Sequence, residues 1–303
     1  PKSSWTDDVD KMQLNLDQDS EAAKVAGTWQ PDGSRHALQQ RVTEVDPKEP
    51  TLRVPPRDGR RSLRVLYLFS GVSRKASIAQ SLRELCDRDG NGLDFFEVDI
   101  LVGGKAHDLL CNESQEAYIS RILEGEFDII ILSPPCGTWS RANWSGGEPK
   151  PCRDRQHPWG FPRSRRGMRR RALTGNEFIH FSIHAIATAK AARDRGLHVR
   201  CLLEHPEYLG RTHNGVPASI WQLEQLRSAF GDDSGISVAG HQCQFPGVDV
   251  KKPTRLFSDV PGVEEFGVVG WPDLDANFNY RGPLPRDCGH VHRTKTIGKN
   301  AEE

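Results

Sequence analysis

Long apolar runs are absent from the 303-residue chain, and none approaches the length that a membrane-spanning helix requires. The first residues also lack the apolar stretch of a secretory signal peptide, so we expect an intracellular protein, nuclear or cytoplasmic. The seven cysteines are scattered singly, without the paired spacing of a disulfide framework, which favours free thiols in a reducing compartment. The formal net charge is zero, so the overall charge by itself excludes no class of partner.

Regular secondary structure is expected mainly between residues 63 and 260. Residues 1–62 are polar and lack sustained periodicity, which predicts a poorly ordered leader with one short helix near 20–25. Residues 261–303 are rich in Gly and Pro, which predicts an irregular tail. Between these regions we expect strands at 63–69, 93–100, 127–132, 198–204, 236–241 and 254–260, and helices at 75–86, 115–123, 176–195 and 218–230. This alternation predicts an α/β fold with a doubly wound, mostly parallel sheet covered on both faces.

Basic residues are concentrated between residues 141 and 171, directly after the turn that contains Cys136. This segment holds ten basic and two acidic residues, although the whole chain is neutral. It could be a solvated, disordered insert, or an arm whose arginines neutralise the backbone phosphates of nucleic acid. We favour the arm because it adjoins the candidate site. The residues assigned to nucleic-acid binding are Arg141, Arg163, Arg165, Arg166, Arg169, Arg170 and Arg171.

Polar and reactive residues stand at the expected carboxyl ends of the strands, where open parallel sheets bind ligands. Gly71 follows the first strand, where a glycine lets a ligand approach the backbone or serves turn geometry alone. Asp99 ends the second strand and could bind a ribose hydroxyl or cap a helix. Asp108 places another carboxylate near a strand end. Cys136 and Glu204 follow two further strands.

Cys136 and Glu204 form the most specific pair. The sequence Ser-Pro-Pro-Cys holds Cys136 at a strand tip, where a thiolate is accessible as a nucleophile and nearby positive charge lowers its pKa. Glu204, at the next strand end, could act as an acid or anchor a bound ring by a hydrogen bond. A lone cysteine is usually an inert apolar residue, and a lone glutamate could cap a turn. Their combination in this strand order indicates a reactive site.

These motifs, in this order, resemble those of the cytosine-5 DNA methyltransferase family. The resemblance extends over about residues 64–260, and the motifs that carry it are Phe69-x-Gly71, Asp99, Asp108, Ser-Pro-Pro-Cys at 133–136 and Glu-His-Pro at 204–206. It implies the methyltransferase version of the doubly wound sheet, with an antiparallel late strand. It also implies that S-adenosylmethionine is the cofactor, bound across the first strand ends by Phe69, Gly71, Asp99, Asp108 and Pro134.

The resemblance further implies a reaction. Cys136 would add to carbon 6 of a cytosine that has been turned out of the DNA stack, which activates carbon 5 for methylation. Glu204 would bind or protonate the edge of the ring at nitrogen 3. Arg255, in the segment Lys-Lys-Pro-Thr-Arg, would help to hold the ring. The partner implied is nucleic acid, and DNA is expected before RNA.

The family pattern is incomplete in this chain. Tyr67 and Ser73 stand where the family has an aspartate and a second glycine. No segment after the last expected strand matches the large target-recognition region of the family, which indicates a divergent member of the kind found in phages or mobile elements. The basic segment and the leader could replace that region in part, or a separate partner could read the target sequence.

Three alternative functions stay open. Exocyclic-amino methyltransferases also carry Ser-Pro-Pro, but an aromatic residue that stacks on the base then takes the position of Cys136. An RNA cytosine methyltransferase would use the same nucleophile and needs less DNA-reading surface. A non-catalytic relic of the fold would bind nucleic acid without binding S-adenosylmethionine.

A metal site is a further alternative, and we expect none. Cysteine and histidine recur late in the chain and could in principle gather a zinc ion at His241, Cys243, Cys288, His290 and His292. Their spacing matches no standard zinc-binding knuckle. Solitary histidines and cysteines are usually structural residues, which favours the simpler interpretation.

Overall fold

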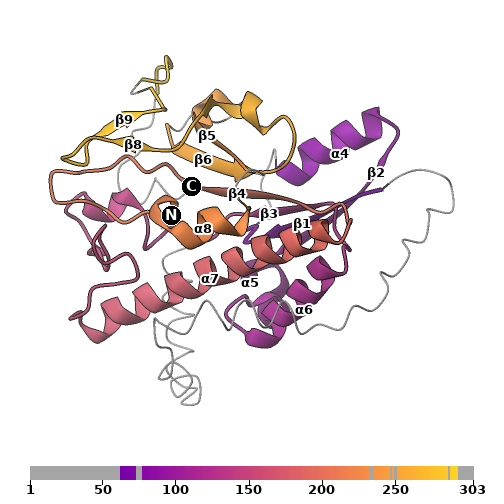
Figure 1. Cartoon of the computed structure of the whole chain (residues 1–303), viewed down its shortest axis with the longest axis horizontal. Coiled ribbons are helices and arrows are strands. Elements are labelled where there is room, and N and C mark those ends of the chain that lie inside the picture. Colours follow the sequence, from indigo (N-terminus) through magenta and orange to yellow (C-terminus); the bar gives the residue numbers. More distant parts are fainter. Residues whose placement is uncertain are drawn as a thin grey trace, which may run out of the picture. The chain divides into compact units, whose positions relative to one another are not determined.

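A seven-stranded sheet forms the centre of the computed structural model (Figure 1). The structure describes residues 62–72, 77–231, 235–245, 248, 251–285 and 287–292. The predicted leader therefore lies outside the described residues, apart from Ser62. Within the described ranges, no helix is both long enough and apolar enough to cross a membrane.

The order of strands in the sheet is β2-β1-β3-β4-β6-β5-β7. Their bounds are β1 (Ser62–Leu68), β2 (Gly92–Val98), β3 (Ile129–Leu132), β4 (Arg200–Pro206), β5 (Ile236–His241), β6 (Pro253–Ser258) and β7 (Val268–Val269). Strands β1 to β4 are mutually parallel, and β6 is antiparallel to both β4 and β5. Strand β5 therefore runs in the same direction as β1 to β4, and the predicted mostly parallel sheet is confirmed.

Helices cover both faces of this sheet, as Figure 1 shows for α4 on one side and for α6, α7 and α8 on the other. The helices are α4 (Ile78–Arg88), α5 (Ile100–Gly103), α6 (Asn112–Leu123), α7 (Arg166–Asp194) and α8 (Glu224–Ala229). Short 3-10 turns connect them: η1 (Gly104–His107), η2 (Arg141–Trp144), η3 (Ile220–Gln222), η4 (Gln242–Gln244) and η5 (Val263–Phe266).

The main core lies between the sheet and helices α6, α7 and α8. Alternate strand residues such as Leu66, Leu68 and Leu132 point into it and are fully buried. Val65, on the opposite face of β1, is also fully buried. Burial on both faces explains why these strands read as continuous apolar runs and not as alternating ones.

Three elements differ from the expectations. Helix α7 begins at Arg166, ten residues before the predicted start, because arginine is a good helix former even where apolar periodicity is missing. The helix expected at 218–230 is divided into η3 and α8. The tail expected to be irregular contributes η5, the edge strand β7, and a two-stranded sheet of β8 (Asp273–Leu274) and β9 (Tyr280–Gly282).

Candidate functional site

The turn after β1 is tied to the end of β2. The backbone N–H of Gly71 donates to Asp99 Oδ2 at 3.0 Å, and the N–H of Leu101 donates to Asp99 Oδ1 at 2.9 Å. Asp99 thus caps helix α5, as one of its two interpretations predicted. Each carboxylate oxygen retains a second lone pair for a ligand. Gly71 has a φ of 66°, and among the described residues no atom other than those of its chain neighbours lies within 4 Å of an added Cβ, so its backbone is open to close approach.

Phe69 and Asp108 contribute differently from what the sequence indicated. The ring of Phe69 is buried and packs edge-on against Phe178 and Phe181 of α7, with ring centroids 5.4 and 6.2 Å away. Its side chain therefore belongs to the core, and only its backbone lies at the strand end. Asp108 follows η1, and its Oδ1 accepts from the N–H of Leu110 at 2.9 Å, which closes a local turn.

Cys136 lies in the turn that follows β3. Cys136 forms no disulfide and is half-buried, so it is not sealed in the core, whereas Pro134, two residues earlier, is buried. The turn begins at Ser133, whose N–H donates to the Leu68 carbonyl at 3.2 Å and whose hydroxyl lies 3.3 Å from the Tyr67 hydroxyl. These bonds join the turn to β1, so the thiol is presented from a fixed backbone.

A buried arginine fastens the Cys136 turn to helix α7. Arg153 is 1% exposed, and its Nη2 donates to Thr138 Oγ1 at 3.0 Å and to the Ala172 carbonyl at 2.8 Å. Its guanidinium lies 3.8 Å from the ring centroid of Trp139, which is also buried. Burial lowers the pKa of Arg153 to about 10, so it stays charged at neutral pH. Arg153 therefore organises the site and does not belong to the solvent-facing basic surface.

The contact between the turn and α7 can be tested at a glycine. A Cβ added to Gly175 would lie 2.2 Å from Thr138 Oγ1 and 3.1 Å from Arg153 Nη2. We expect Gly175→Ala to lower the free energy of unfolding by about 1–3 kcal/mol, because it overpacks this contact. Gly167→Ala is the matched control in the same helix, since a Cβ there meets no atom of the described part of the chain within 4 Å. Urea denaturation measures both, and equal stabilities for the two variants would contradict the tight contact.

Glu204 lies beside the Cys136 turn at the carboxyl edge of the sheet. The last parallel pair of β3 and β4 is Leu132 with Leu203, so Ser133 and Glu204 follow side by side. Glu204 Oε1 is out of contact with solvent and has no hydrogen-bond partner among the residues that the structure describes. Burial raises the pKa of Glu204, and the positive charge of Lys252 lowers it to a smaller extent. The site therefore contains a half-buried acid that holds its proton more tightly than a carboxyl in water does.

Arg255 does not join this pair. Residues paired in register point to the same face of a sheet, and Arg255 pairs with His205, whereas Glu204 pairs with Leu256. Arg255 and Glu204 therefore point to opposite faces. Arg255 is 0% exposed and binds Glu207 through two hydrogen bonds of 2.6 and 2.8 Å. Its Nη1 donates to Ser237 Oγ and to the Gly270 carbonyl. The structure gives Arg255 a structural role in place of the predicted catalytic one.

The basic segment leads from the Cys136 turn into the start of α7. Arg165 is the N-cap of the helix, and Arg163, Arg165, Arg166 and Arg169 are exposed. Arg141 is tied down, because its Nη1 donates to the Leu209 carbonyl at 2.8 Å. The other two assigned residues, Arg170 and Arg171, are half-buried. Arg171 donates to the Lys150 carbonyl at 3.1 Å. Arg141 is nevertheless exposed as well, so the segment is an ordered part of the fold with five arginines that face solvent.

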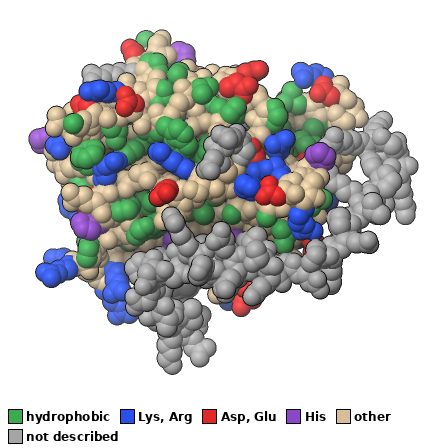
Figure 2. Space-filling model, in the orientation of Figure 1, with side chains coloured by type: hydrophobic (Ala, Val, Ile, Leu, Met, Phe, Trp, Pro, Cys, Tyr) green, Lys and Arg blue, Asp and Glu red, His purple; other side chains and the backbone are tan. Residues whose placement is uncertain are grey.

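The length of α7 sets where these arginines lie. At about 1.5 Å per residue, its 29 residues extend about 44 Å, whereas the seven residues of β4 extend about 23 Å. The helix ends next to the amino end of β4, so its first turns project past the carboxyl edge that carries Cys136 and Glu204. Figure 2 shows Lys and Arg side chains at the lower left, over the start of α7.

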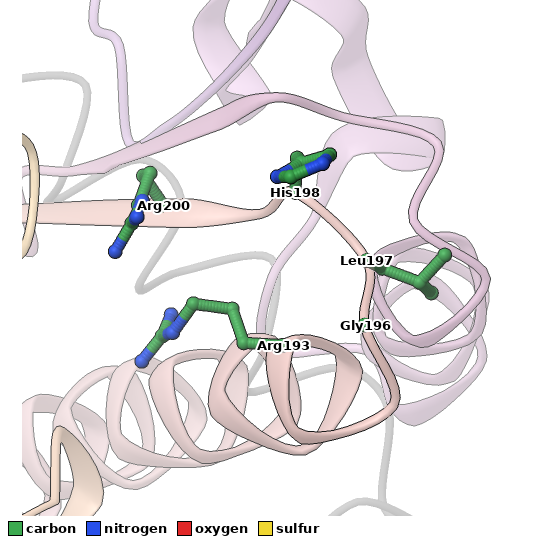
Figure 3. A pocket seen from close by; sticks show the side chains of 5 residues that line it. All are labelled: Arg193, Gly196, Leu197, His198 and Arg200. Atoms are coloured by element: carbon green, nitrogen blue, oxygen red, sulfur yellow. The ribbon is translucent and has the colours of Figure 1, made fainter.

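A hollow of about 210 Å³ lies away from this edge, between the end of α7 and the start of β4 (Figure 3). Its lining residues are Arg193, Gly196, Leu197, His198 and Arg200. Arg193 forms a 2.6 Å ion pair with the buried Asp259, whose other oxygen accepts from the N–H of Cys201. This hollow is at the amino edge of β4 and therefore does not belong to the candidate site.

The fold and the site define a class: an α/β protein whose mostly parallel sheet carries a thiol, a half-buried acid and an open glycine turn at its carboxyl edge. Sequence reasoning missed Arg153, which no local motif distinguishes from its solvated neighbours. It also missed Lys252, whose charge acts on Glu204. Comparisons of the chain with protein-family models, with curated proteins and with solved structures found no match.

Proposed function

We propose that this protein is an S-adenosylmethionine-dependent methyltransferase that acts on carbon 5 of cytosine in nucleic acid through Cys136. The observation that carries the proposal is that the half-buried Cys136 and the half-buried acid Glu204, whose Oε1 is out of contact with solvent, follow the carboxyl ends of two adjacent parallel strands. The reversed strand β6 between β4 and β5 supports it, since the resemblance implies an antiparallel late strand.

The turn at Gly71 and Asp99 fits the cofactor role. The open space beside Gly71 leaves room for a ligand against the backbone, and the Asp99 carboxylate can accept from ribose hydroxyls. When bound, S-adenosylmethionine supplies an electrophilic methyl group for carbon 5. The fixed backbone between Phe69 and Gly71 holds this side of the site, because the N–H of Phe69 donates to the Val98 carbonyl at 2.8 Å.

The chemistry assigned to the chain begins at the sulfur of Cys136. Its thiolate forms a bond to carbon 6 of the ring, and the displaced electron pair makes carbon 5 nucleophilic. Protonated Glu204 donates to ring nitrogen 3, which stabilises the negative charge that develops there. After methylation a base removes the proton from carbon 5, the electron pair reforms the double bond between carbons 5 and 6, and Cys136 leaves as thiolate. The proton shared with ring nitrogen 3 returns to Glu204.

Glu204→Gln should change activity and stability in opposite directions. We expect methyl transfer to fall roughly a hundredfold or more, because the amide is a far weaker proton donor. Because the pKa of Glu204 is raised in the folded chain, the folded chain binds this proton more tightly than the unfolded chain does. As the pH rises above the ordinary carboxyl pKa of 4.5, the folded protein therefore loses stability relative to the unfolded chain. The variant should therefore be more stable than the wild type at neutral pH, and this difference should vanish in acid.

The control for this experiment is Glu116→Gln, which removes an exposed carboxyl from α6. Wild-type activity should fall as the pH rises through the raised pKa of Glu204, and the control should share that profile. Stability is followed by urea denaturation between acid and neutral pH. A Glu204→Gln variant with wild-type activity and an unchanged pH profile would remove Glu204 from the mechanism.

The exposed arginines at the start of α7 support a polyanionic partner. Each arginine that contacts a phosphate contributes about one unit to the slope of log affinity against log salt concentration. We expect the double variant Arg165→Gln, Arg166→Gln to bind duplex DNA more weakly, with a slope shallower by about two units. The matched double variant Arg83→Gln, Arg88→Gln removes exposed arginines of α4 and should leave the slope unchanged. Fluorescence anisotropy at several salt concentrations gives both slopes.

The experiment that tests the proposed function is methyl transfer from isotopically labelled S-adenosylmethionine to DNA and to RNA, followed by digestion to nucleosides. Labelled 5-methylcytosine is expected, and the polymer that carries it distinguishes DNA from RNA as substrate. Label on an exocyclic amino group would establish the amino-methyltransferase alternative. Absence of both transfer and calorimetric S-adenosylmethionine binding would indicate the non-catalytic alternative.

A further inference from the structure

Four potential metal ligands from distant parts of the chain meet beside the end of β5. Cys243 lies in η4, directly after that strand, and the other three follow β9 in the tail. The ligand atoms all lie within 4.8 Å of one another, and they belong to Cys243, Cys288, His290 and His292. Both cysteines are free thiols. The sequence-based expectation of no metal site rested on the spacing of neighbouring residues. That spacing cannot reveal a ligand such as Cys243, which comes from a distant part of the chain.

The tail presents its three ligands from alternate residues around a turn. Gly289 has a φ of 74°, and its N–H donates to Asp287 Oδ1 at 3.1 Å. This conformation suits glycine and brings the chain back on itself, so Cys288 Sγ lies 2.9 Å from His292 Nε2.

We propose that Cys243, Cys288, His290 and His292 bind one Zn²⁺ ion in a tetrahedral site. Two thiolates and two imidazoles are a ligand set that zinc prefers, and four protein ligands leave no position open for substrate, as in structural sites. Zinc–ligand bonds of about 2.0–2.3 Å place neighbouring ligand atoms about 3.5 Å apart. The observed cluster therefore needs side-chain movements of only about 1 Å to enclose the ion.

A second contact already holds the tail against this part of the sheet. The ring of His241 is buried at the end of β5, and its Nε2–H donates to the Pro285 carbonyl at 3.1 Å. Cys243 is buried as well, whereas His290 is exposed. The ion would thus join a buried anchor in the fold to a surface segment, and zinc binding should contribute directly to the stability of the tail.

The position of the cluster relates it to the candidate site without making it part of that site. Strand β5 runs parallel to β4, so Cys243 lies at the same edge of the sheet as Glu204. The N–H of Gln242 donates to the Lys252 carbonyl at 3.0 Å, and the charge of Lys252 acts on Glu204. An ion bound at Cys243 would therefore fix the backbone that carries Lys252.

The first test is the metal content of the full chain, purified in reducing buffer and measured by plasma mass spectrometry. We expect one zinc per chain in the wild type and in Cys111→Ser, which changes a half-buried cysteine outside the cluster. Cys288→Ser and His292→Ala should lose most of the metal. Wild-type protein that binds no zinc after incubation with the ion, or that forms a Cys243–Cys288 disulfide in this buffer, would overturn the proposal.

A cobalt titration of wild-type protein gives a readout that does not depend on any variant folding. Co²⁺ in a tetrahedral site with two thiolates produces intense visible bands and a near-ultraviolet charge-transfer band. We expect both to saturate at one equivalent and to disappear when one equivalent of Zn²⁺ is added. The weak visible spectrum of six-coordinate Co²⁺, with no charge-transfer band, would overturn the site.

Discussion

Replacing Cys136 with serine is expected to reduce methyl transfer roughly a thousandfold or more, because a serine hydroxyl is a far weaker nucleophile than a thiolate. The Cys136 turn should keep its structure, since it is held by the backbone hydrogen bond of Ser133 and by the hydrogen bond from Arg153 to Thr138, and not by the sulfur. Calorimetric binding of S-adenosylmethionine should therefore persist in Cys136→Ser. That result would separate loss of the nucleophile from loss of the fold.

A trapping experiment examines the same residue through a covalent product. In DNA that contains 5-fluorocytosine, fluorine replaces the proton that must leave carbon 5, so the adduct cannot resolve. Wild-type protein and Cys111→Ser should each yield a protein–DNA complex that resists denaturation, whereas Cys136→Ser should yield none. Methyl transfer undiminished in Cys136→Ser would end the proposed mechanism, even if the protein proved to be a methyltransferase of another kind.

Arg255→Met is expected to lower the free energy of unfolding by about 3–5 kcal/mol, because it leaves the carboxylate of Glu207 buried without its charge partner. Arg255 and Glu207 are joined by two hydrogen bonds, and both side chains are fully buried. The Tyr280 hydroxyl also donates to Glu207, so the loss should extend to β9. Urea denaturation followed by circular dichroism measures the change.

The double variant Arg255→Met, Glu207→Gln provides the control for this prediction. Removing the unpaired charge should recover much of the lost stability, since the cost arises chiefly from the isolated carboxylate. The strand register also predicts that folded Arg255→Met retains S-adenosylmethionine binding, because its side chain points away from Glu204. A variant of unchanged stability that has lost methyl transfer would restore the catalytic role expected from the sequence.

Much of the sheet could be predicted from the sequence because strand composition is a local property. The segments around β1, β3 and β4 read as continuous apolar runs, and parallel strands necessarily bring their carboxyl ends to one edge. That the Cys136 turn and Glu204 both follow strands at that edge could therefore be predicted from strand order alone, and the parallel pairing of β3 with β4 confirms that the two strands are neighbours.

The features that could not be predicted depend on long-range placement. Arg255 and Glu204 lie on opposite faces only because of the register between β4 and β6, and a shift of one residue would reverse that relation. Arg153 differs from its solvated neighbours only through its burial against Trp139. The ligand cluster joins Cys243 to a tail whose composition indicated no regular structure. None of these relations leaves a periodic signal in the chain.

Helix α7 holds its exposed first turn at a fixed distance from the Cys136 turn. Its last turn is fixed to the sheet by the ion pair between Arg193 and Asp259. Nearer its start, the Ala172 carbonyl accepts a hydrogen bond from Arg153, which also holds the Cys136 turn. The exposed arginines at its first turn therefore stand at a constant offset from the sulfur. Under the proposed function, these arginines would bind the phosphates of a nucleic-acid strand at a fixed distance from the sulfur of Cys136. The length of α7 would then determine which nucleotide of that strand reaches the thiol.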